Sequence, residues 1–504
     1  MRVLGQDRVG PEPFYSEPHR FSYHNHFVPH ATPKRVLTLA PMPPEKCAYA
    51  LARYSRSPDS IRESLDWVRS HDSRKFLEHF YFQYGHSSIA DLGHVVMCFE
   101  GISELAATEV EDEPLWDGQA KSSRYQDFSR CGFVTPEEFS PPDAARYEAA
   151  ADKLLAAYQE VHTRMAEFFR ERLPCPEAMS PEAYQRSIAA RAFDVARYLL
   201  FFGVPTNLGQ VTSIRTLEKQ IRRLKVSPYG ELRSLAAEMA AACAAEPDCP
   251  WDTADREAVA PTLAQWADAD YYLSQARDDL AEWARQNLPP PAGLEVDAVD
   301  LSRPADTAAD IVATLLYTVS DRPYRELYEL ARGWPPGMRA EVLDLVLRSR
   351  TERDEMLRAF RGGCFVYDLI MDLGAYRDLH RHRRCQQHRQ AYSARLGFDV
   401  PKPLAAAGLR ERYEALMRET LATVRQLPDP GGHYLLPFGA RSRFLFKMDF
   451  AEVDYICRIR TTVKGHFSYR EIAWQMKLKL EQLEPELGRL IQATPPWVED
   501  PLSR

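Results

Sequence analysis

The chain has 504 residues, of which 45% are hydrophobic and 11% aromatic, and its formal net charge is −8. These values exclude a disordered chain and a single small domain, and they predict two or three globular domains. No apolar run of about 18 residues is present, and the first residues lack the apolar stretch of a signal peptide. Nine scattered cysteines without a Cys-x-x-Cys pair are typical of reduced thiols. We therefore expect a cytoplasmic protein that does not span a membrane. The acidic net charge argues against a general coat of nucleic acid, but it does not exclude a local basic groove.

The sequence divides into four segments of different character. Residues 1–44 carry many Pro, His and aromatic residues without periodicity, and we expect an irregular arm. Residues 45–245 and 305–504 are predicted to form two domains. Between them, residues 246–304 are acidic and contain Pro289-Pro290-Pro291, which indicates a linker.

Several helices and one strand of the first domain are predicted directly. Helix formers begin at Pro58 and continue through Tyr84, and apolar residues recur at helical spacing over 143–173. Ser180 followed by Pro181 is a favourable start for a helix that reaches Tyr198. The short apolar run 93–99 has the length and β-branched content of a strand. The predicted fold class is α+β, with two similar domains in which helices pack on a small antiparallel or mixed sheet.

A short echo links the two predicted domains. Residues 197–203 read Arg-Tyr-Leu-Leu-Phe-Phe-Gly, and residues 433–439 read His-Tyr-Leu-Leu-Pro-Phe-Gly, 236 positions later. Each is followed by a helical stretch with paired basic residues, Arg222-Arg223 in one and Arg458-Ile459-Arg460 in the other. This parallel predicts an internal duplication of about 230 residues.

The most basic segment of this acidic chain lies at 377–395, where nine of nineteen residues are Arg or His. On a helix, Arg377, Arg381, Arg384 and His388 would share one face. Because like charges on one face weaken a helix, this pattern favours a site for an anion over a solvated basic surface. Cys385 lies within the segment. If this thiol were exposed, the flanking basic residues would lower its pKa and make it reactive. We favour the alternative, a buried structural thiol.

Three motifs carry a family resemblance: Gly101-Ile102-Ser103, Ser122-Ser123-Arg124-Tyr125 and Arg381-His382-Arg383. Together they resemble the signature of flavin-dependent thymidylate synthases, in which Gly-Ile-Ser, Arg-His-Arg and Ser-x-Arg-Tyr follow one another. The stretch from His86 through Ser88 to Asp91 is similar to the flavin-contacting segment of that family, and the stretch ending at Ser55 resembles the end of its first helix. The resemblance covers most of residues 45–240 and 310–485.

Each half departs from the family pattern at a different place. Asp112-Glu113-Pro114 stands where the first half should read Arg-His-Arg. The second half has Arg381-His382-Arg383, but Ala391-Tyr392-Ser393-Ala394 replaces Ser-x-Arg-Tyr, and Glu471-Ile472-Ala473 replaces Glu-Ile-Arg. Each half therefore keeps what the other lacks, and we expect the two to supply different walls of one composite pocket.

The resemblance implies roles for particular residues. Substrate contacts are implied for Ser122, Ser123, Arg124 and Tyr125, flavin contacts for Ser55, His86, Ser88, Asp91, Arg381, His382 and Arg383, and catalytic contacts to the base for Arg215 and Arg233. Guanidinium groups suit these roles because they bind phosphate bidentately and stabilise charge that builds on a reacting ring. The plainer alternatives are a surface Arg124 beside a turn and a polar helix start at His86, Ser88 and Asp91.

The implied reaction is reductive methylation of carbon 5 of dUMP, with FAD as cofactor and with NADPH and methylene-tetrahydrofolate as co-substrates. A homodimer would provide four repeats, and no metal is expected. This chemistry requires no protein nucleophile, and the sequence contains no Gly-x-Ser-x-Gly, Gly-x-Gly-x-x-Gly, P-loop or His-Glu-x-x-His motif. Two alternatives stay open: methylation of another uridine nucleotide or with another one-carbon donor, and a non-catalytic protein that binds flavin, a nucleotide or nucleic acid.

Overall fold

A computed structural model of the chain describes residues 42–55, 60–74, 87–124, 126–247, 258, 261–266, 269, 298–302, 306–317, 324–348 and 356–502. Residues 1–41, which make up nearly all of the predicted arm, and most of the predicted linker lie outside these ranges. Residues from Met42 onward form one compact unit. Within the described residues, none of the helices combines the length and apolar character needed to cross a membrane.

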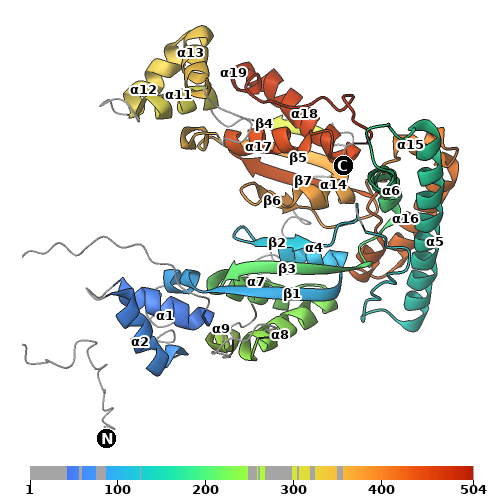
Figure 1. Ribbon diagram of the computed structural model, residues 1–504, viewed down its shortest axis with the longest axis horizontal. Coiled ribbons are helices and arrows are strands. Elements are labelled where there is room, and N and C mark those ends of the chain that lie inside the picture. The colour runs from blue at the N-terminus through green and yellow to red at the C-terminus, as the bar shows by residue number, and fades with distance from the viewer. Residues whose placement is uncertain are drawn as a thin grey trace, which may run out of the picture. The chain divides into compact units, whose positions relative to one another are not determined.

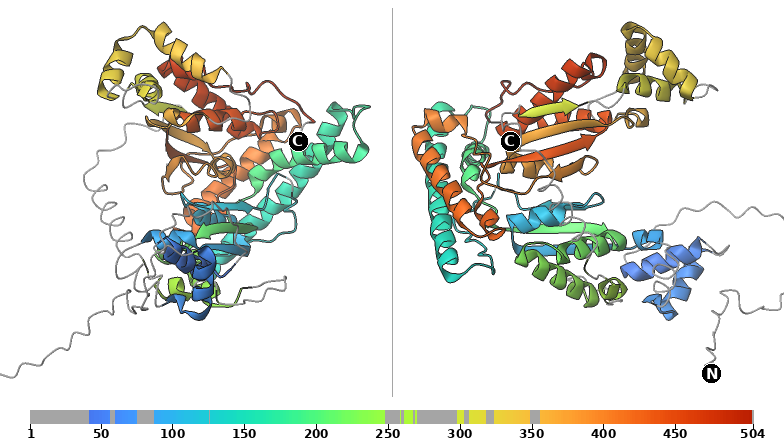
Figure 2. Two further views of the ribbon diagram at one scale, coloured as in Figure 1. Left: turned by 60° about the vertical axis from the view of Figure 1, so that its left-hand side comes forward. Right: turned by 180° about the vertical axis from the view of Figure 1, so that it is seen from behind.

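The first half contains a three-stranded antiparallel sheet of order β1-β3-β2. The strands are β1 (His94–Ser103), β2 (Asp117–Ala120) and β3 (Pro205–Ser213). In β1 every second residue from Val95 to Phe99 is buried, which is the alternation expected of a sheet with one covered face. Helices α7 (Ile214–Lys225) and α8 (Gly230–Ala244) lie along one face of this sheet (Figures 1 and 2).

The second half contains a four-stranded antiparallel sheet of order β4-β5-β7-β6. The strands are β4 (Val299–Ser302), β5 (Phe365–Asp372), β6 (Gln386–Arg389) and β7 (Arg441–Met448), followed by helices α17 (Phe450–Arg460) and α18 (Phe467–Leu483). The α+β prediction with two small sheets is thus confirmed. Strand β4 falls inside the range predicted as linker, yet it pairs with β5 of the second sheet.

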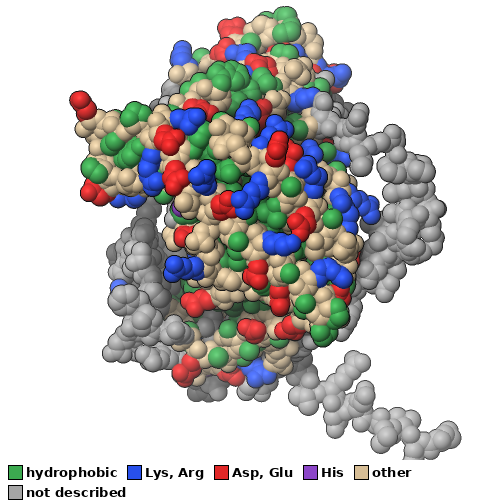
Figure 3. Space-filling view, turned by 90° about the vertical axis from the view of Figure 1, so that its right-hand side faces the viewer, with side chains coloured by type: hydrophobic (Ala, Val, Ile, Leu, Met, Phe, Trp, Pro, Cys, Tyr) green, Lys and Arg blue, Asp and Glu red, His purple; other side chains and the backbone are tan. Residues whose placement is uncertain are grey.

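A helical layer joins the two sheet regions. Helix α5 (Pro141–Arg172) packs against α6 (Pro181–Ala196) and α16 (Arg410–Gln426), and Figure 1 shows the three side by side. Lys153 of α5 pairs with Glu419 of α16, and Arg412 of α16 with Glu160 of α5. On the face that carries these helices, cationic and anionic side chains are interspersed (Figure 3). This surface therefore offers no patch of one sign.

The remaining described elements are short. They are α1 (Pro44–Tyr54), α2 (Ile61–Ser70), η2 (Ser87–Leu92), α4 (Glu104–Glu111), η3 (Arg197–Leu199), α9 (Pro261–Trp266), α11 (Thr307–Tyr317), α12 (Tyr324–Gly333), α13 (Pro336–Leu347), η4 (Arg358–Phe360), α14 (Leu373–Leu379), α15 (Lys402–Ala406), η5 (Gly431–Leu435) and α19 (Pro485–Gly488).

The two halves repeat one succession of elements. In each, a strand runs into a short helix, a second strand follows, and a third strand inserted between the first two leads into two helices. The short helices begin with equivalent caps, because Ser103 and Asp372 each accept a hydrogen bond from the backbone N–H three residues later. Asp117 of β2 pairs with Val211 of β3, and Gln386 of β6 pairs with Lys447 of β7 in the same register.

One residue breaks the equivalence of β1 and β5. The pairing of β1 with β3 shifts between Phe99 and Ile102, whereas the pairing of β5 with β7 runs without a shift. Gly101 lies in this bulge with φ +67° and donates its N–H to the side chain of Asn207. The Gly-Ile-Ser motif of the first half therefore marks a β-bulge, where glycine accommodates the left-handed conformation.

The echoed segments 197–203 and 433–439 pair with each other. Phe201 and Pro437 form an antiparallel bridge. Around it, each backbone hydrogen bond from the first half to the second has an equivalent in the opposite direction. The N–H of Phe202 donates to the Leu436 carbonyl, and the N–H of Phe438 donates to the Leu200 carbonyl. In the same way, Gly203 donates to Tyr434 and Gly439 donates to Tyr198. The echo is therefore the seam along which the two halves meet.

The sequence predictions for individual elements have mixed outcomes. The strand at 93–99 and the helix at 143–173 are confirmed, and Ser180 caps α6 by accepting from the Ala183 N–H. The prediction of one helix carrying Arg377, Arg381, Arg384 and His388 is wrong, because α14 ends at Leu379 and His388 lies in β6. The side-chain amide of Gln387 donates to the carbonyls of Leu379 and His382. These hydrogen bonds satisfy backbone carbonyls that the end of α14 leaves without helical partners. The basic residues after Leu379 therefore do not share one helical face.

Candidate functional site

A cavity of about 780 Å³ is lined by both halves of the chain. The first half contributes Asp91, Ser213 and the loop before β2, and the second half contributes residues 381–384 and the exposed side of α17. Six arginines and four carboxylates line it. They are Arg361, Arg381, Arg383, Arg384, Arg458 and Arg460, with Asp91, Asp117, Glu452 and Asp454. The excess of cations and the volume suit an anionic organic ligand.

Arg381 is the cation in this cavity whose environment most favours a ligand. Its side chain is half-buried and forms no hydrogen bond or ion pair with another residue that the structure describes. A guanidinium group withdrawn from water without a partner loses hydration and recovers little in return. An anion in the cavity would supply that missing partner.

His382 is buried and held from two sides. Its Nε2 accepts a hydrogen bond from Arg460 Nε at 2.8 Å, and its Nδ1 lies 3.4 Å from Glu452 Oε1. Since Nε2 accepts, the neutral ring carries its proton on Nδ1, facing Glu452. Burial lowers the pKa of His382, although the hydrogen bond with Glu452 opposes this shift. His382 is therefore a neutral, rigidly oriented wall of the cavity.

Arg383 joins the two halves across the cavity. It forms an ion pair with Asp117 of β2, and its guanidinium carbon lies 5.6 Å from the ring centroid of Trp116. The side chain of Asp117 is 80% exposed, so this pair contributes little to stability and is readily exchanged for another anion.

Asp91 and Arg215 form a pair at the edge of the cavity. Arg215 Nη1 donates to Asp91 Oδ2 at 2.9 Å, while Ser213 donates to the other carboxylate oxygen at 3.4 Å. Asp91 and Ser213 line the cavity, whereas Arg215 reaches it only through Asp91. The structure thus brings four predicted flavin contacts together here, namely Asp91, Arg381, His382 and Arg383.

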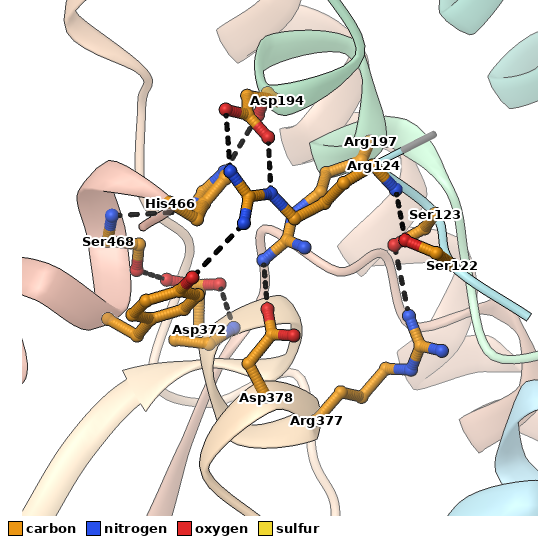
Figure 4. Close-up of polar contacts among 12 residues, drawn as sticks. Ser122, Ser123, Arg124, Asp194, Arg197, Asp372, Arg377, Asp378, His466 and Ser468 are labelled. Carbon is orange, nitrogen blue, oxygen red and sulfur yellow. Dashed lines mark hydrogen bonds and ion pairs between the residues drawn. The ribbon is translucent and has the colours of Figure 1, made fainter. Parts of the chain in front are cut away.

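Arg124 lies outside this cavity, in a buried polar cluster between the halves (Figure 4). Its Nε and Nη2 donate to Asp194, its Nη1 donates to Tyr469 at 3.1 Å, and its Nη2 also donates to the Lys464 carbonyl. Burial alone would lower the pKa of Arg124, but Asp194 outweighs it and raises the pKa. Its donors are thus engaged within the protein.

The serines before Arg124 serve the same junction. Ser122 accepts from the backbone N–H of Arg124 at 3.3 Å, which shapes the turn, and the buried Ser123 accepts from Arg377 Nη1 at 3.2 Å. Arg377 of α14 also lies 2.6 Å from Glu104 of α4. These residues therefore connect the short helices of the two halves (Figure 4).

A second buried pair strengthens this junction. Arg197, at the start of the echoed segment of the first half, donates to Asp378 of α14 in the second half at 3.0 Å. Burial would raise the pKa of Asp378, but Arg197, Arg381 and Arg460 lower it to about 2. Asp378 therefore stays ionised and lies within the field of the cavity cations.

The other predicted site residues fall elsewhere. Arg233 pairs with Glu138 at 3.5 Å and donates to the Ser227 carbonyl, and Ser55 donates to the Ala52 carbonyl at the end of α1. Neither lines the cavity. Tyr125 and His86 lie outside the described residues, and only the backbone of Ser88, in η2, is described.

Cys385 is buried, as favoured from the sequence. Burial raises the pKa of its thiol, so the flanking arginines do not produce a reactive thiolate. The sequence interpretation missed Arg361, Arg458, Arg460 and Glu452 as cavity residues. The paired basic residues at 458 and 460 were the one signal that could have identified them.

The family model described as thymidylate synthase complementing protein matches residues 37–250 and 344–486. The chain therefore belongs to this family, and both halves take part in the match. It is also similar to a UPF0159 protein of Chlamydia muridarum, at 25% identity over 433 residues that cover 82% of this chain and 78% of the relative.

Two further similarities complete the comparison. A UPF0159 protein of Thermoplasma acidophilum, Ta1429, is 23% identical over 486 residues, which cover 88% of this chain and 94% of the relative. Among solved structures, the UMP/dUMP methylase PolB from Streptomyces cacaoi, bound with 5-Br dUMP, covers 39% of this chain and 94% of its own, at 14% identity and a TM-score of 0.31.

Proposed function

We propose that this protein is a flavin-dependent nucleotide methylase that transfers a one-carbon unit to carbon 5 of dUMP, with methylene-tetrahydrofolate and NADPH as co-substrates. Membership of the family supports this class of reaction. The observation that carries the proposal is Arg381, a half-buried cation that forms no hydrogen bond or ion pair among the described residues, in a cavity that both halves line.

The residues present fit FAD. Its pyrophosphate requires cations, and Arg381 and Arg383 are available at one wall of the cavity. Among the described residues the first forms no ion pair, and the second forms an exposed ion pair with Asp117. Its ring system requires a flat, partly apolar surface, and Trp116 and Tyr455 line the same cavity. When bound, FAD would supply the redox chemistry that the side chains of the chain lack.

The protein's own groups would bind and orient. Arg381 and Arg383 would hold phosphate oxygens, which leaves their donors satisfied. His382 is kept neutral and in one tautomer by Glu452 and Arg460, so it would present a fixed, uncharged surface beside the cofactor. Asp91 and Ser213 would close the opposite edge, with Arg215 holding the carboxylate in place.

Arg124 has a different part in this proposal from the one that the family resemblance implies. A phosphate bound to Arg124 would have to displace the buried carboxylate of Asp194, which already satisfies two of its nitrogens. We therefore do not assign the substrate phosphate to Arg124, and we assign Arg124 to the junction between the halves. We also propose a homodimer, which would place four repeats in one assembly.

The experiment is a direct assay of the purified protein. Freshly purified protein should show flavin absorbance, and it should release tritium from [5-³H]dUMP only when methylene-tetrahydrofolate and NADPH are both present. The variant Arg381→Ala should lose bound flavin and activity, whereas Arg410→Ala, which removes an exposed arginine of α16, should retain both. Flavin without tritium release would leave a flavoprotein with another substrate, and absence of flavin would refute the proposal.

A further inference from the structure

Asp117 and Arg383 form an ion pair that crosses the cavity from one half of the chain to the other. The two side chains are unequally exposed, at 80% for Asp117 and 30% for Arg383. The backbone of Asp117 is fixed, because β2 pairs with β3 at Val211. Release of Arg383 therefore requires only that the Asp117 side chain rotate into solvent.

The other described carboxylates of the cavity wall lie beside groups other than Arg383. The pairs are Asp91 with Arg215, Glu452 with His382, and Asp454 with Arg458. Among these carboxylates, Asp117 is thus the one paired with an arginine that is a proposed phosphate contact.

The first half contains an ion pair of the opposite kind. Glu113 lies four residues before β2, as His382 lies four residues before β6. Both Nε and Nη2 of Arg223 donate to Glu113 Oε1, at 2.9 and 2.8 Å, and Nη2 also donates to the Glu109 carbonyl. The Glu113 side chain is only 10% exposed. A ligand would have to uncover this pair before exchanging it, whereas the Asp117 carboxylate already lies in solvent.

The exposed pair has no counterpart in the internal repeat. Asp117 and Gln386 begin the equivalent strands β2 and β6, and Pro114 and Arg383 each lie three residues before one of these strands. Exchange of the two halves would therefore pair Pro114 with Gln386, neither of which is charged. The repeated architecture does not require an ion pair here, which favours a role for it at the cavity.

Trp116 can keep Arg383 at the cavity when Asp117 moves away. The guanidinium carbon lies 5.6 Å from the centroid of the buried Trp116 ring, and Trp116 Nε1 donates to Gln210 Oε1 at 2.7 Å. A fixed aromatic ring attracts a guanidinium group without occupying its hydrogen-bond donors. Those donors would then be available to an incoming anion.

We propose that Asp117 is a displaceable counter-ion that makes the cavity selective for phosphorylated ligands; the identity of the ligand, FAD, rests on the proposed function. A carboxylate ligand offers Arg383 the same group as Asp117, and it must also lose the translational freedom that Asp117, as part of the chain, does not have. A pyrophosphate brings more charge and more oxygens, so it can bind Arg381 and Arg383 together. Asp117 would return to Arg383 when the ligand leaves.

Titration of the full chain with FAD, riboflavin and inorganic pyrophosphate, followed by calorimetry, tests this role. Asp117→Asn removes the competitor, so the affinities for FAD and pyrophosphate should rise about two- to fivefold, the range expected from the loss of an exposed ion pair. Riboflavin lacks phosphate, and its affinity should be the same in both proteins. Asp117→Glu should return the affinities for FAD and pyrophosphate to wild-type values, because it restores the carboxylate.

Two controls separate competition for Arg383 from a general effect of charge. Asp112→Asn removes another exposed carboxylate from the segment between α4 and β2, and it should leave the three affinities unchanged. In an Arg383→Gln background, Asp117→Asn should have no further effect, because the residue for which Asp117 competes is absent.

The outcomes separate the role of Asp117 from the flavin site. If FAD binds but Asp117→Asn does not raise its affinity, or if the gain persists in Arg383→Gln or extends to riboflavin, the counter-ion alone is refuted. Pyrophosphate binding without FAD binding refutes the flavin site, and a gain for pyrophosphate in Asp117→Asn then supports the counter-ion independently. Absence of binding by both FAD and pyrophosphate refutes both.

Discussion

Tyr198 and Tyr434 occupy equivalent positions in the two echoed segments, and each donates its hydroxyl to a carboxylate beside the seam. Tyr198 donates to Asp372 of the second half at 3.1 Å, and Tyr434 donates to Glu231 of the first half at 2.9 Å. The partners of these carboxylates are exchanged. Ser103 at the cap of α4 donates to Glu231 of α8, whereas Ser468 of α18 donates to Asp372 at the cap of α14. In the first half the serine caps the short helix and the acid lies in the later helix, whereas in the second half these two positions are reversed.

This exchange predicts matched losses of stability. Tyr198→Phe and Tyr434→Phe each remove one donor from a carboxylate at the seam, which should lower the free energy of unfolding by about 1–3 kcal/mol. Urea unfolding measures both. A matched control is Tyr455→Phe, whose partly exposed ring lies in α17. If both seam variants were as stable as the wild type, the hydroxyl contacts would not hold the halves together.

Arg124 offers a second stability prediction. Arg124→Met should leave Asp194 buried without its bidentate partner, at a cost of about 3–5 kcal/mol. Arg124→Met/Asp194→Leu should recover part of that loss, because the uncompensated charge is then absent. Thermal or urea unfolding of the single and double variants tests this cycle. A single variant of wild-type stability that fails only to bind nucleotide would restore Arg124 to the phosphate site.

The bulge at Gly101 predicts a local conformational effect. Gly101→Ala should destabilise the protein by about 1 kcal/mol, because alanine disfavours φ +67° although nothing lies within 4 Å of the added Cβ. Gly209→Ala in β3 is the matched control, since that site is equally open and lacks a positive φ. Denaturation midpoints compare the two, and equal stability of both variants would contradict the strained bulge.

Asp399 predicts a dependence of stability on pH. Burial, and secondly the charge of Asp372, raise the pKa of Asp399 to about 6. The folded protein therefore holds this proton more tightly than the unfolded chain, so the group contributes stability at low pH that is lost as pH rises through about 6. The free energy of unfolding of the wild type, minus that of Asp399→Asn, should decrease between pH 4 and pH 7. A difference that is constant over this range would contradict the shifted pKa.

Local patterns predicted much of the fold. The caps and apolar spacing of α5 and α6 depend on neighbours along the chain, as does the alternation of β1, so sequence reasoning located them. The echo at 197–203 predicted the duplication because the segments are equivalent at the seam. The basic run misled, since helical spacing was assumed beyond Leu379, where α14 ends and the Gln387 side chain donates to the Leu379 carbonyl.

The candidate site was only partly predictable, and the reason is physical. Arg381, His382 and Arg383 are neighbours in sequence, so their common location followed from the motif. Asp194 and Lys464, which engage Arg124, are 70 and 340 residues away from it. Such partners are set by how the halves pack, which no local pattern encodes.

An FAD titration of the wild type and Arg381→Ala, monitored by flavin fluorescence, tests the composite flavin site most directly. Arg381 forms no hydrogen bond or ion pair among the described residues, so its removal should lower the melting temperature only through the lost attraction to Asp378. FAD affinity should fall about tenfold or more in Arg381→Ala through loss of charge-assisted contacts. Equal FAD affinity in the two proteins, or no affinity in the wild type, would contradict a composite flavin site in this cavity.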